Sequence, residues 1–132
     1  MRVSKMSYLG KVRGQGRPRF GNGCAYEAAA DRAYKKALRA CYIEQGGSHY
    51  GDSPIAVTII AYCPLPKCKP KSLEVEPYMV KPDADNLAKA VLDALTGVAF
   101  DDDRQVTRLI VVKKDRTRGV QEGLRVYVRK VD

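Results

Sequence analysis

Residues 81–106 read KPDADNLAKAVLDALTGVAFDDDRQV and hold six of the fifteen acidic residues in the chain. The remainder of the 132 residues is strongly basic, because the whole chain has a formal net charge of +9. Crowded carboxylates repel one another and are driven toward protonation unless a positive charge lies among them. An acidic cluster in a basic protein therefore indicates a metal site, and the basic remainder indicates a polyanionic partner.

The middle of this stretch predicts a helix over residues 86–95. Leu87, Val91 and Leu95 recur at helical spacing and form an apolar face. Asp85 precedes this helix and is a candidate N-cap. In that role its carboxylate would accept bonds from free amide groups, which requires no metal.

The charged residues around the start of this helix are candidates for binding a metal ion and a phosphate. Pro82 favours an extended backbone, so Asp83 and Asp85 are expected to point to the same side of the chain. Lys89 follows Asp85 by one helical turn. It is either a surface partner of Asp85 or Asp93, worth about a few tenths of a kcal/mol, or an ammonium group that faces a scissile phosphate.

A triple aspartate at residues 101–103 precedes a predicted strand over residues 105–113. Such a run is common in solvated turns, but the start of a strand can also bring one of the three beside Asp83 and Asp85. Three converging carboxylates without histidine or cysteine are typical of sites for a hard cation, Mg²⁺ or Mn²⁺. Such ions bind phosphate oxygens and activate water, so a basic protein with this site is expected to be a nuclease.

The other predicted elements complete one small α/β (α+β) domain over residues 1–132. A helix is expected over residues 25–45, with Arg32, Lys35, Lys36 and Arg39 on its polar face. Residues 53–63 are apolar on both faces, which predicts a central strand. Further strands are expected over residues 4–12, 73–75, 105–113 and 123–130, the last two joined by the turn DRTRGVQE.

Two basic segments are candidate DNA-binding regions. Residues 1–26 contain no acid, and residues 64–82 form a long loop rich in proline and lysine. Cations in such segments are expected to bind the DNA backbone without reading sequence. The candidates are Lys11, Arg13, Arg17, Arg19, Lys67, Lys69 and Lys71.

The four cysteines lack the closely spaced pairs that are typical of structural zinc. We expect Cys24, Cys41, Cys63 and Cys68 to be reduced and mostly packed, with Cys41 on the apolar stripe of the first helix.

No apolar run has the length of a membrane span, and the N-terminal residues lack the apolar block of a secretory signal. A soluble cytoplasmic protein is therefore expected.

The order of the motifs resembles the RusA family of Holliday junction resolvases. The residues are PDADNLAKAVLDAL followed by DDDRQV, with GRPRF near the N-terminus. The family pattern is Asp-x-Asp-Asn-Leu-x-x-Lys at a helix start, then Leu-Asp-Ala-Leu, then Asp-Asp-x-Gln-Val before a strand. The resemblance is close over residues 78–112 and looser over most of the chain.

This resemblance implies a Mg²⁺-dependent endodeoxyribonuclease, for which Mn²⁺ can substitute, that makes paired symmetric nicks in four-way junctions during recombination and repair. It implies a homodimer with a mixed β-sheet packed against two main helices, at the nucleoid, without membrane contact or a small-molecule cofactor. By position, Asp83, Asp85 and Asp103 would be metal ligands and Lys89 the essential side chain near the phosphate. Asp102 would be secondary, and Asp101 is an additional acid.

Other classes of function explain part of these observations. A non-catalytic protein that binds branched DNA would account for the basic charge but not for Asp83, Asp85, Lys89 and Asp103 together. A phosphohydrolase for small molecules would account for the acidic residues but not for the charge of +9. An inactive resolvase that only binds junctions would keep every motif, because a sequence does not report activity.

Overall fold

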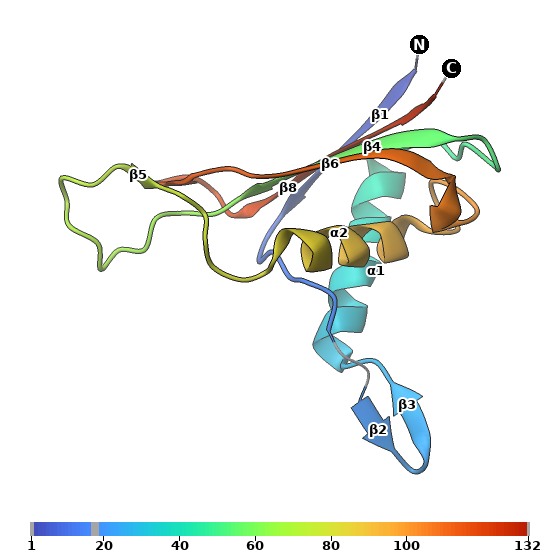
Figure 1. Ribbon diagram of the computed structural model, residues 1–132, viewed down its shortest axis with the longest axis horizontal. Coiled ribbons are helices and arrows are strands. Elements are labelled where there is room, and N and C mark those ends of the chain that lie inside the picture. Colours follow the sequence, from blue (N-terminus) through green and yellow to red (C-terminus); the bar gives the residue numbers. More distant parts are fainter. Residues whose placement is uncertain (1, 17–18, 132) are drawn as a thin grey trace.

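Four strands form one mixed sheet that lies over two helices (Figure 1). The structure, a computed structural model, describes residues 2–16 and 19–131, and only the backbone of Arg19 and Ala25. The strand order is β1 (Val3–Leu9), β8 (Gly123–Lys130), β4 (Ile55–Tyr62) and β6 (Val106–Lys113). β4 and β6 are parallel, and the other neighbouring pairs are antiparallel. The expected mixed sheet with two main helices is therefore confirmed.

The two helices cover one face of the sheet. α1 (Ala29–Glu44) packs against β1 and α2 (Ala84–Leu95) packs against β6, and the two helices contact each other. Leu87, Val91 and Leu95 of α2 are fully buried, which confirms its predicted apolar face. Complete burial of a leucine or valine side chain contributes roughly 1.5–3 kcal/mol. The core between the helices and the sheet therefore holds α2 firmly in position.

β4 is the central strand that its two-sided apolarity predicts. Ile55, Val57, Ile59 and Ala61 point into the core and are at most 1% exposed. The alternate residues, Ala56 to Tyr62, lie on the outer face of the sheet and are more accessible. β4 is hydrogen-bonded to β8 on one side and to β6 on the other.

β6 and β8 are not neighbours, although the turn DRTRGVQE was expected to join two strands directly. They lie on opposite sides of β4, so the chain crosses the sheet between them. Part of the expected turn forms β7 (Arg116–Thr117), which pairs with β5 (Val75–Glu76). This small second sheet anchors the proline-rich loop and forms an arm at one end of the molecule (Figure 1).

The first helix begins four residues later than residue 25 because a hairpin precedes it. β2 (Arg19–Gly21) and β3 (Cys24–Tyr26) pair around Asn22 and Gly23, both of which have positive φ. An Asn-Gly pair at these two positions is a strong signal for a type I′ turn. No strand was predicted in this segment, although the Asn-Gly pair could have indicated the hairpin. The hairpin projects from the end of α1 away from the sheet (Figure 1).

Candidate active site

Asp83 and Asp85 lie at the N-terminal end of α2. Asp83, and not Asp85, occupies the N-cap position, and its carbonyl oxygen accepts a hydrogen bond from the Leu87 amide at 2.9 Å. The predicted N-cap role of Asp85 is therefore wrong, because the helix begins at Ala84 and includes Asp85 in its first turn. The Asp83 side chain makes no capping hydrogen bond. Both carboxylates are exposed and can accept a ligand at the positive end of the helix dipole.

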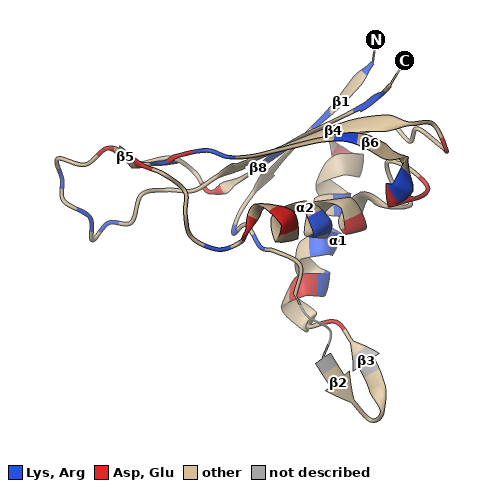
Figure 2. Ribbon diagram, in the orientation of Figure 1, with Lys and Arg blue, Asp and Glu red and all other residues tan. Residues whose placement is uncertain are grey.

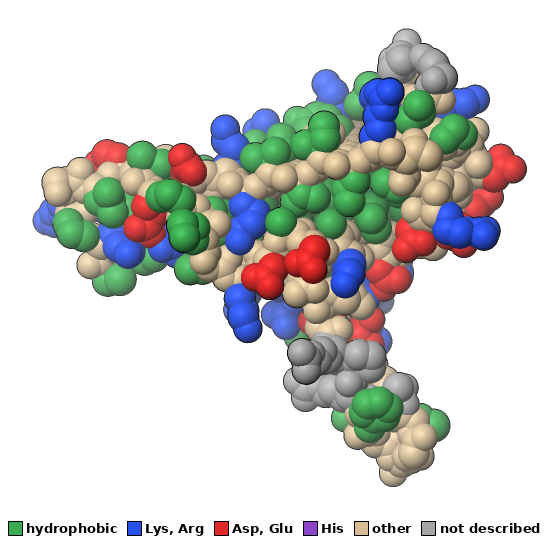
Figure 3. Space-filling view, in the orientation of Figure 1, with side chains coloured by type: hydrophobic (Ala, Val, Ile, Leu, Met, Phe, Trp, Pro, Cys, Tyr) green, Lys and Arg blue, Asp and Glu red, His purple; other side chains and the backbone are tan. Residues whose placement is uncertain are grey.

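Lys89 is exposed on α2, one turn after Asp85. Asp93, one of its two candidate partners, instead accepts a hydrogen bond from Lys35 at 2.5 Å. Among the described residues no ion pair to Lys89 is found within 4.0 Å. Its ammonium group is therefore available, and Figure 3 shows acidic and basic side chains side by side on this surface over α2.

The three aspartates at residues 101–103 make different contacts. Asp101 lies 3.3 Å from His49 as an ion pair if that histidine is protonated. Asp102 caps the short helix η1 (Asp103–Gln105) by accepting a hydrogen bond from the Arg104 amide at 2.9 Å. That amide holds the pKa of the Asp102 carboxyl below its usual range. Asp103 is exposed and forms no ion pair with another described residue.

Gln105 fixes this acidic turn to the loop before β4. Its side-chain oxygen accepts hydrogen bonds from the amides of Asp101 and Asp102 at 2.9 and 2.7 Å. Its side-chain nitrogen donates to the carbonyl oxygens of Gly51 and Ser53 at 2.7 and 2.8 Å. Hydrogen bonds through Gln105 therefore fix the conformation of the turn against a segment distant in sequence.

A cleft of 870 Å³ lies between the N-terminal segment and the start of α2. The Gln15 amide donates to the Asn86 carbonyl oxygen at 2.9 Å, which holds the two segments together. A Cβ at Gly14 would lie 2.9 Å from the Cβ of Pro82, so only glycine allows this close approach. The cleft is lined by residues 11–16 and by Asp31, Lys81, Pro82, Asp83 and Asn86.

This cleft brings two predicted DNA-binding cations beside a predicted metal ligand. Lys11 and Arg13 line the same cleft as Asp83. Arg13 is 3.4 Å from Asp31, while its Nε is buried without a hydrogen-bond partner. The side-chain oxygen of Gln15 is also buried and unpaired. Buried polar groups without partners are uncommon in proteins, so Arg13 Nε and Gln15 Oε1 are exceptions beside this cleft.

The remaining predicted DNA-binding residues lie elsewhere. Lys67, Lys69 and Lys71 belong to the loop that precedes β5, in the arm seen in Figure 2, and Lys69 pairs with Glu76 at 3.3 Å. Arg17 lies outside the described residues, and Arg19 is described only as the first residue of β2.

The donor atoms of Asp83, Asp85 and Asp103 suit a hard divalent cation, because all three side chains are carboxylates. Within the described part of one chain, however, no three Asp, Glu, His or Cys side chains are grouped closely enough to hold a metal ion. α2 has twelve residues and is therefore about 18 Å long. Figure 1 shows that the start of α2 and the segment before β6 lie at opposite ends of this helix. The chain thus presents two carboxylates at the start of α2 and Asp103 beyond its other end.

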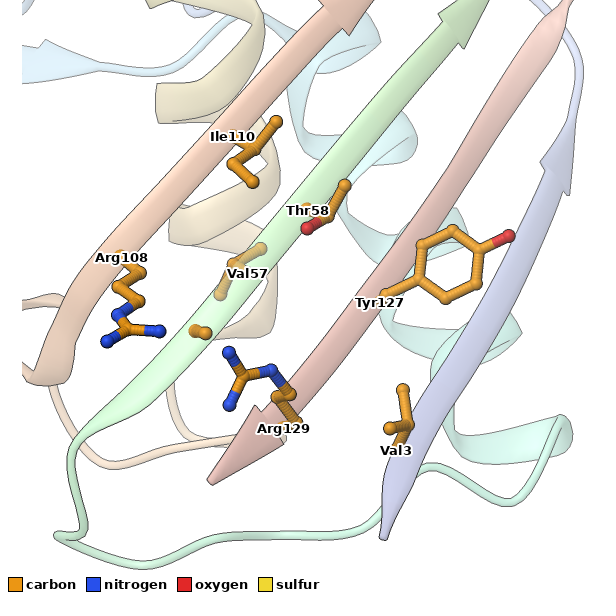
Figure 4. A pocket seen from close by; sticks show the side chains of 8 residues that line it. Val3, Val57, Thr58, Arg108, Ile110, Tyr127 and Arg129 are labelled. Carbon is orange, nitrogen blue, oxygen red and sulfur yellow. The ribbon is translucent and has the colours of Figure 1, made fainter. Parts of the chain in front are cut away.

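The outer face of the sheet carries two arginines that were not among the predicted DNA-binding residues. Arg108 and Arg129 flank Ala56 in a shallow pocket of 300 Å³, and Tyr127 lines it (Figure 4). The four strands contain no acidic residue. Side chains alternate between the two faces of a sheet along each strand. The positions of Arg108 in β6 and of Tyr127 and Arg129 in β8 could therefore have predicted that they share the outer face.

The cysteine prediction is correct in part. All four cysteines are free thiols, and Cys41 and Cys63 pack against the core. Burial raises the pKa of both packed thiols. Cys24 and Cys68 are exposed, so the predicted packing role is wrong for them.

Among the helices of residues 2–16 and 19–131, none has the length and apolarity needed to cross a membrane.

Comparisons with known proteins identify the family of the chain. The family model described as Endodeoxyribonuclease RusA matches residues 10–129. The chain is also 30% identical over 121 residues to the uncharacterized protein YqaN of Bacillus subtilis (strain 168), with 83% of this chain and 85% of that protein covered. The family match begins after β1 and spans both helices, β4 and β6, and β8 up to residue 129. The resemblance inferred from residues 78–112 is therefore confirmed, and the chain belongs to the RusA endodeoxyribonuclease family.

Proposed function

We propose that this protein is a metal-dependent endodeoxyribonuclease that resolves four-way DNA junctions by paired symmetric nicks, as a homodimer at the nucleoid. The family supports a DNA-cleaving activity on branched substrates. The observation that carries the proposal furthest is the cleft in which Lys11 and Arg13 lie beside Asp83. A phosphodiester held by those cations would lie next to a carboxylate at a helix N-terminus.

The carboxylates would hold the metal ion, and the cations would hold the DNA. Asp83, Asp85 and Asp103 are the proposed ligands of Mg²⁺ or Mn²⁺. When bound, such an ion stabilises the charge that develops on phosphate oxygens and lowers the pKa of a coordinated water. Lys11 and Arg13 would bind and orient the phosphate backbone, because their side chains line the cleft around Asp83.

Lys89 is proposed to act on the reacting phosphate. Its ammonium is exposed one helical turn from Asp85, and Asp93 is already bound to Lys35. A lysine with no competing ion pair can move toward a phosphate without first breaking a contact. It would neutralise charge on the phosphate oxygens as the bond to the leaving oxygen breaks.

The assignment within the triple aspartate also has structural support. Asp101 pairs with His49 and Asp102 caps η1, so each has a role in stabilising the turn. Asp103 has neither role and is exposed. It is therefore the member best suited to bind a metal ion.

The loop cations extend the proposed DNA contact surface. Lys67 and Lys71 are exposed on the arm formed by β5 and β7, away from the cleft. A four-way junction has arms that extend well beyond the crossover, and a projecting basic arm can contact their phosphates. These contacts would contribute to affinity without selecting a base sequence.

A labelled synthetic four-way junction and a matched linear duplex provide the test, each incubated with Mg²⁺ or with a chelator. We expect paired nicks in the junction only, and only with Mg²⁺. Asp83→Asn should retain junction binding and lose cleavage, whereas Glu74→Gln, a change at an exposed carboxylate on the arm, should cleave normally. Junction binding without nicks under all conditions would favour the alternative of a non-catalytic protein that binds branched DNA.

A second readout does not depend on cleavage. A ligand that binds only the folded state stabilises it, by about 2.7 kcal/mol at a concentration of 100 times its Kd. Mg²⁺ should therefore raise the melting temperature of the wild-type protein, and Asp83→Asn should reduce that rise. An equal rise in both proteins would place the cation elsewhere.

A further inference from the structure

The outer face of the main sheet has no described helix over it. α1 and α2 both pack on the opposite face, so the sheet is a single layer that is open on this side (Figure 1). The open face of such a sheet is usually polar. Here it includes exposed aliphatic side chains, because Val3 is 40%, Ile110 57% and Val112 38% exposed. Exposed apolar residues gathered on one surface indicate a binding surface.

The strand register arranges the side chains of this face in rows. Two adjacent rows cross the strands in the order β1, β8, β4 and β6. The first row consists of Val3, Arg129, Ala56 and Arg108, and the second of Lys5, Tyr127, Thr58 and Ile110. Adjacent rows lie about 7 Å apart, because two residues of a strand span about that distance. Cations, an aromatic ring and aliphatic groups are therefore close neighbours on this face.

Two arginines converge in the first row. The Arg108 and Arg129 side chains extend toward each other across β4 (Figure 4). Both lie opposite Ala56, whose small side chain leaves a hollow of 300 Å³ between them. The four strands contain no acidic residue, and Arg108 forms no ion pair within 4.0 Å with another described residue. A phosphate group between the two guanidinium groups would offset their repulsion and accept hydrogen bonds from both.

Tyr127 and Ile110 supply an apolar surface beside the two arginines. Both line the same hollow. Tyr127 is half-buried, and Arg125 and Arg129 lie two residues to either side of it on the same face of β8. Single-stranded nucleic acids bind to surfaces of this kind, because their bases stack on aromatic rings while cations contact their phosphates.

A second aromatic ring with an arginine beside it lies farther along the same face. The Arg125 guanidinium lies 5.5 Å from the centre of the Tyr62 ring, within the range of a cation–π interaction. Tyr62 belongs to β4, next to β8. The outer face therefore offers aromatic rings at two positions, each with a guanidinium group nearby.

A single strand suits this face better than a duplex does. The bases of a duplex are stacked inside it, and their edges are reached only through the grooves, which a flat sheet does not enter. A duplex on this face would offer phosphates to the arginines but no partner to Tyr127, Ile110 and Val112. An unpaired base has a free face that can stack on an aromatic ring.

We propose that the outer face of the main sheet binds single-stranded DNA, with a phosphate between Arg108 and Arg129 and a base stacked on Tyr127. DNA is the expected strand because the family acts on DNA. This inference goes beyond the proposed function, since it concerns a strand that the protein holds and does not cut. α2, which follows Asp83, packs on the opposite face of the sheet (Figure 1). Branched DNA with a single-stranded arm would therefore engage both faces.

Fluorescence anisotropy with a labelled oligothymidylate tests the stacked base. A length of about 12 nucleotides lies within the roughly 4–16 that one single-strand binding fold covers. A chelator is present throughout, so neither metal binding nor cleavage contributes to the signal. Tyr127→Ala should weaken binding roughly 5- to 150-fold, which corresponds to the loss of one stacked base. Tyr127→Phe should bind as the wild type does, because it keeps the ring.

Arg108→Gln tests the phosphate contact at an exposed position, where a substitution does not disturb the core. Each phosphate contact to a single strand adds about 0.7 to the slope of log affinity against log salt concentration. Arg108→Gln should therefore reduce that slope by about this amount. Lys36→Gln, which also removes one exposed cation but lies on α1, is the matched control and should leave the slope unchanged.

A hairpin duplex of equal length and vesicles of phosphatidylserine are the comparison ligands. We expect Tyr127→Ala to leave duplex binding within about twofold of the wild type. An equal loss of affinity for the oligothymidylate and the duplex would mean that this face binds duplex DNA, which overturns the inference. Vesicle binding that Arg108→Gln abolishes, with unchanged oligothymidylate binding, would assign the face to a lipid surface instead.

Unchanged oligothymidylate binding in both Tyr127→Ala and Arg108→Gln would also overturn the inference. The proposed function is measured separately, as Mg²⁺-dependent nicking of a fully base-paired junction. Loss of the single-strand effect with normal nicking would remove only the proposal for the outer face. Normal single-strand binding without any nicking would remove only the proposed nuclease function.

Discussion

The ammonium group of Lys35 lies 2.5 Å from the carboxylate of Asp93 and joins α1 to α2. Lys35 is only 3% exposed and also donates to Glu27 at 2.7 Å. Lys35 was predicted to lie on the polar face of the first helix, but this residue is buried because α2 packs against α1 there. Arg39 adds a second link by donating to the Ala94 carbonyl oxygen at 2.8 Å. The end of α2 that lies away from Asp83 and Asp85 is therefore fixed by α1.

Removal of the Lys35 ammonium should destabilise the protein. Hydrogen bonds to charged groups contribute about 1.5–3 kcal/mol, so Lys35→Ala should lower the unfolding free energy by roughly that amount. Lys36→Ala, at the exposed neighbouring position, should change it by less than about 0.5 kcal/mol. Urea denaturation of both variants measures the difference. Equal effects would mean that the buried ion pair adds nothing to stability.

The same ion pair predicts a dependence of stability on alkaline pH. Burial lowers the pKa of Lys35, but its hydrogen bonds to Asp93 and Glu27 outweigh burial and raise the pKa above the usual 10.5. A group whose folded pKa is raised contributes stability that is complete below its unfolded pKa and is lost as pH rises through the folded pKa. The stability difference between wild type and Lys35→Met should therefore shrink as pH rises above 10.5. A difference that stays constant would contradict the charge interaction.

Lys89→Ala should impair cleavage without impairing binding. Removing one group that stabilises transition-state charge typically costs about 10²–10³ in rate. Single-turnover cleavage of a junction at saturating protein measures this loss directly. Lys36→Ala serves as the control for removal of an exposed helix lysine. If Lys89→Ala cleaves within about twofold of the wild type, Lys89 is a surface residue with no catalytic part.

The three aspartates before β6 should differ in their effects. Asp103→Asn should abolish cleavage, because a proposed ligand charge is lost. Asp101→Asn should leave the cleavage rate near wild type, since Asp101 contacts His49 on the side of the turn. Junction cleavage at several Mg²⁺ concentrations distinguishes the two. A loss of cleavage in Asp101→Asn alone would move the ligand assignment to that residue.

Lys11 should contribute to DNA affinity through phosphate contact. Each phosphate contact adds about 0.9 to the slope of log affinity against log salt concentration, so Lys11→Ala should reduce that slope by about that amount. Junction binding between low and moderate salt measures the slope, with Lys36→Ala for comparison. An unchanged slope would mean that the DNA does not enter the cleft that Lys11 lines.

Local features of the sequence were sufficient to predict the family, the two helices and the central strand. Leu87, Val91 and Leu95 recur with the helical period, and that period alone assigns one face of α2 to the core. The acidic pair, the lysine one turn later and the aspartates before a strand are likewise adjacent in sequence. The three candidate ligands are carboxylates, so their preference for a hard cation follows from residue type alone.

Only the tertiary structure decided which distant segments meet. The sequence could not reveal that β4 separates β6 from β8, because strand pairing depends on contacts between segments far apart in the chain. Lys35 has the spacing of a solvent-facing residue and is buried only because Asp93 of another helix lies beside it. In the same way, Lys11 and Asp83 share a cleft, while Asp83 and Asp103 lie toward opposite ends of α2. Spacing along the chain determines which side chains share one face of a helix or strand, whereas the packing of helices on the sheet determines which functional groups converge.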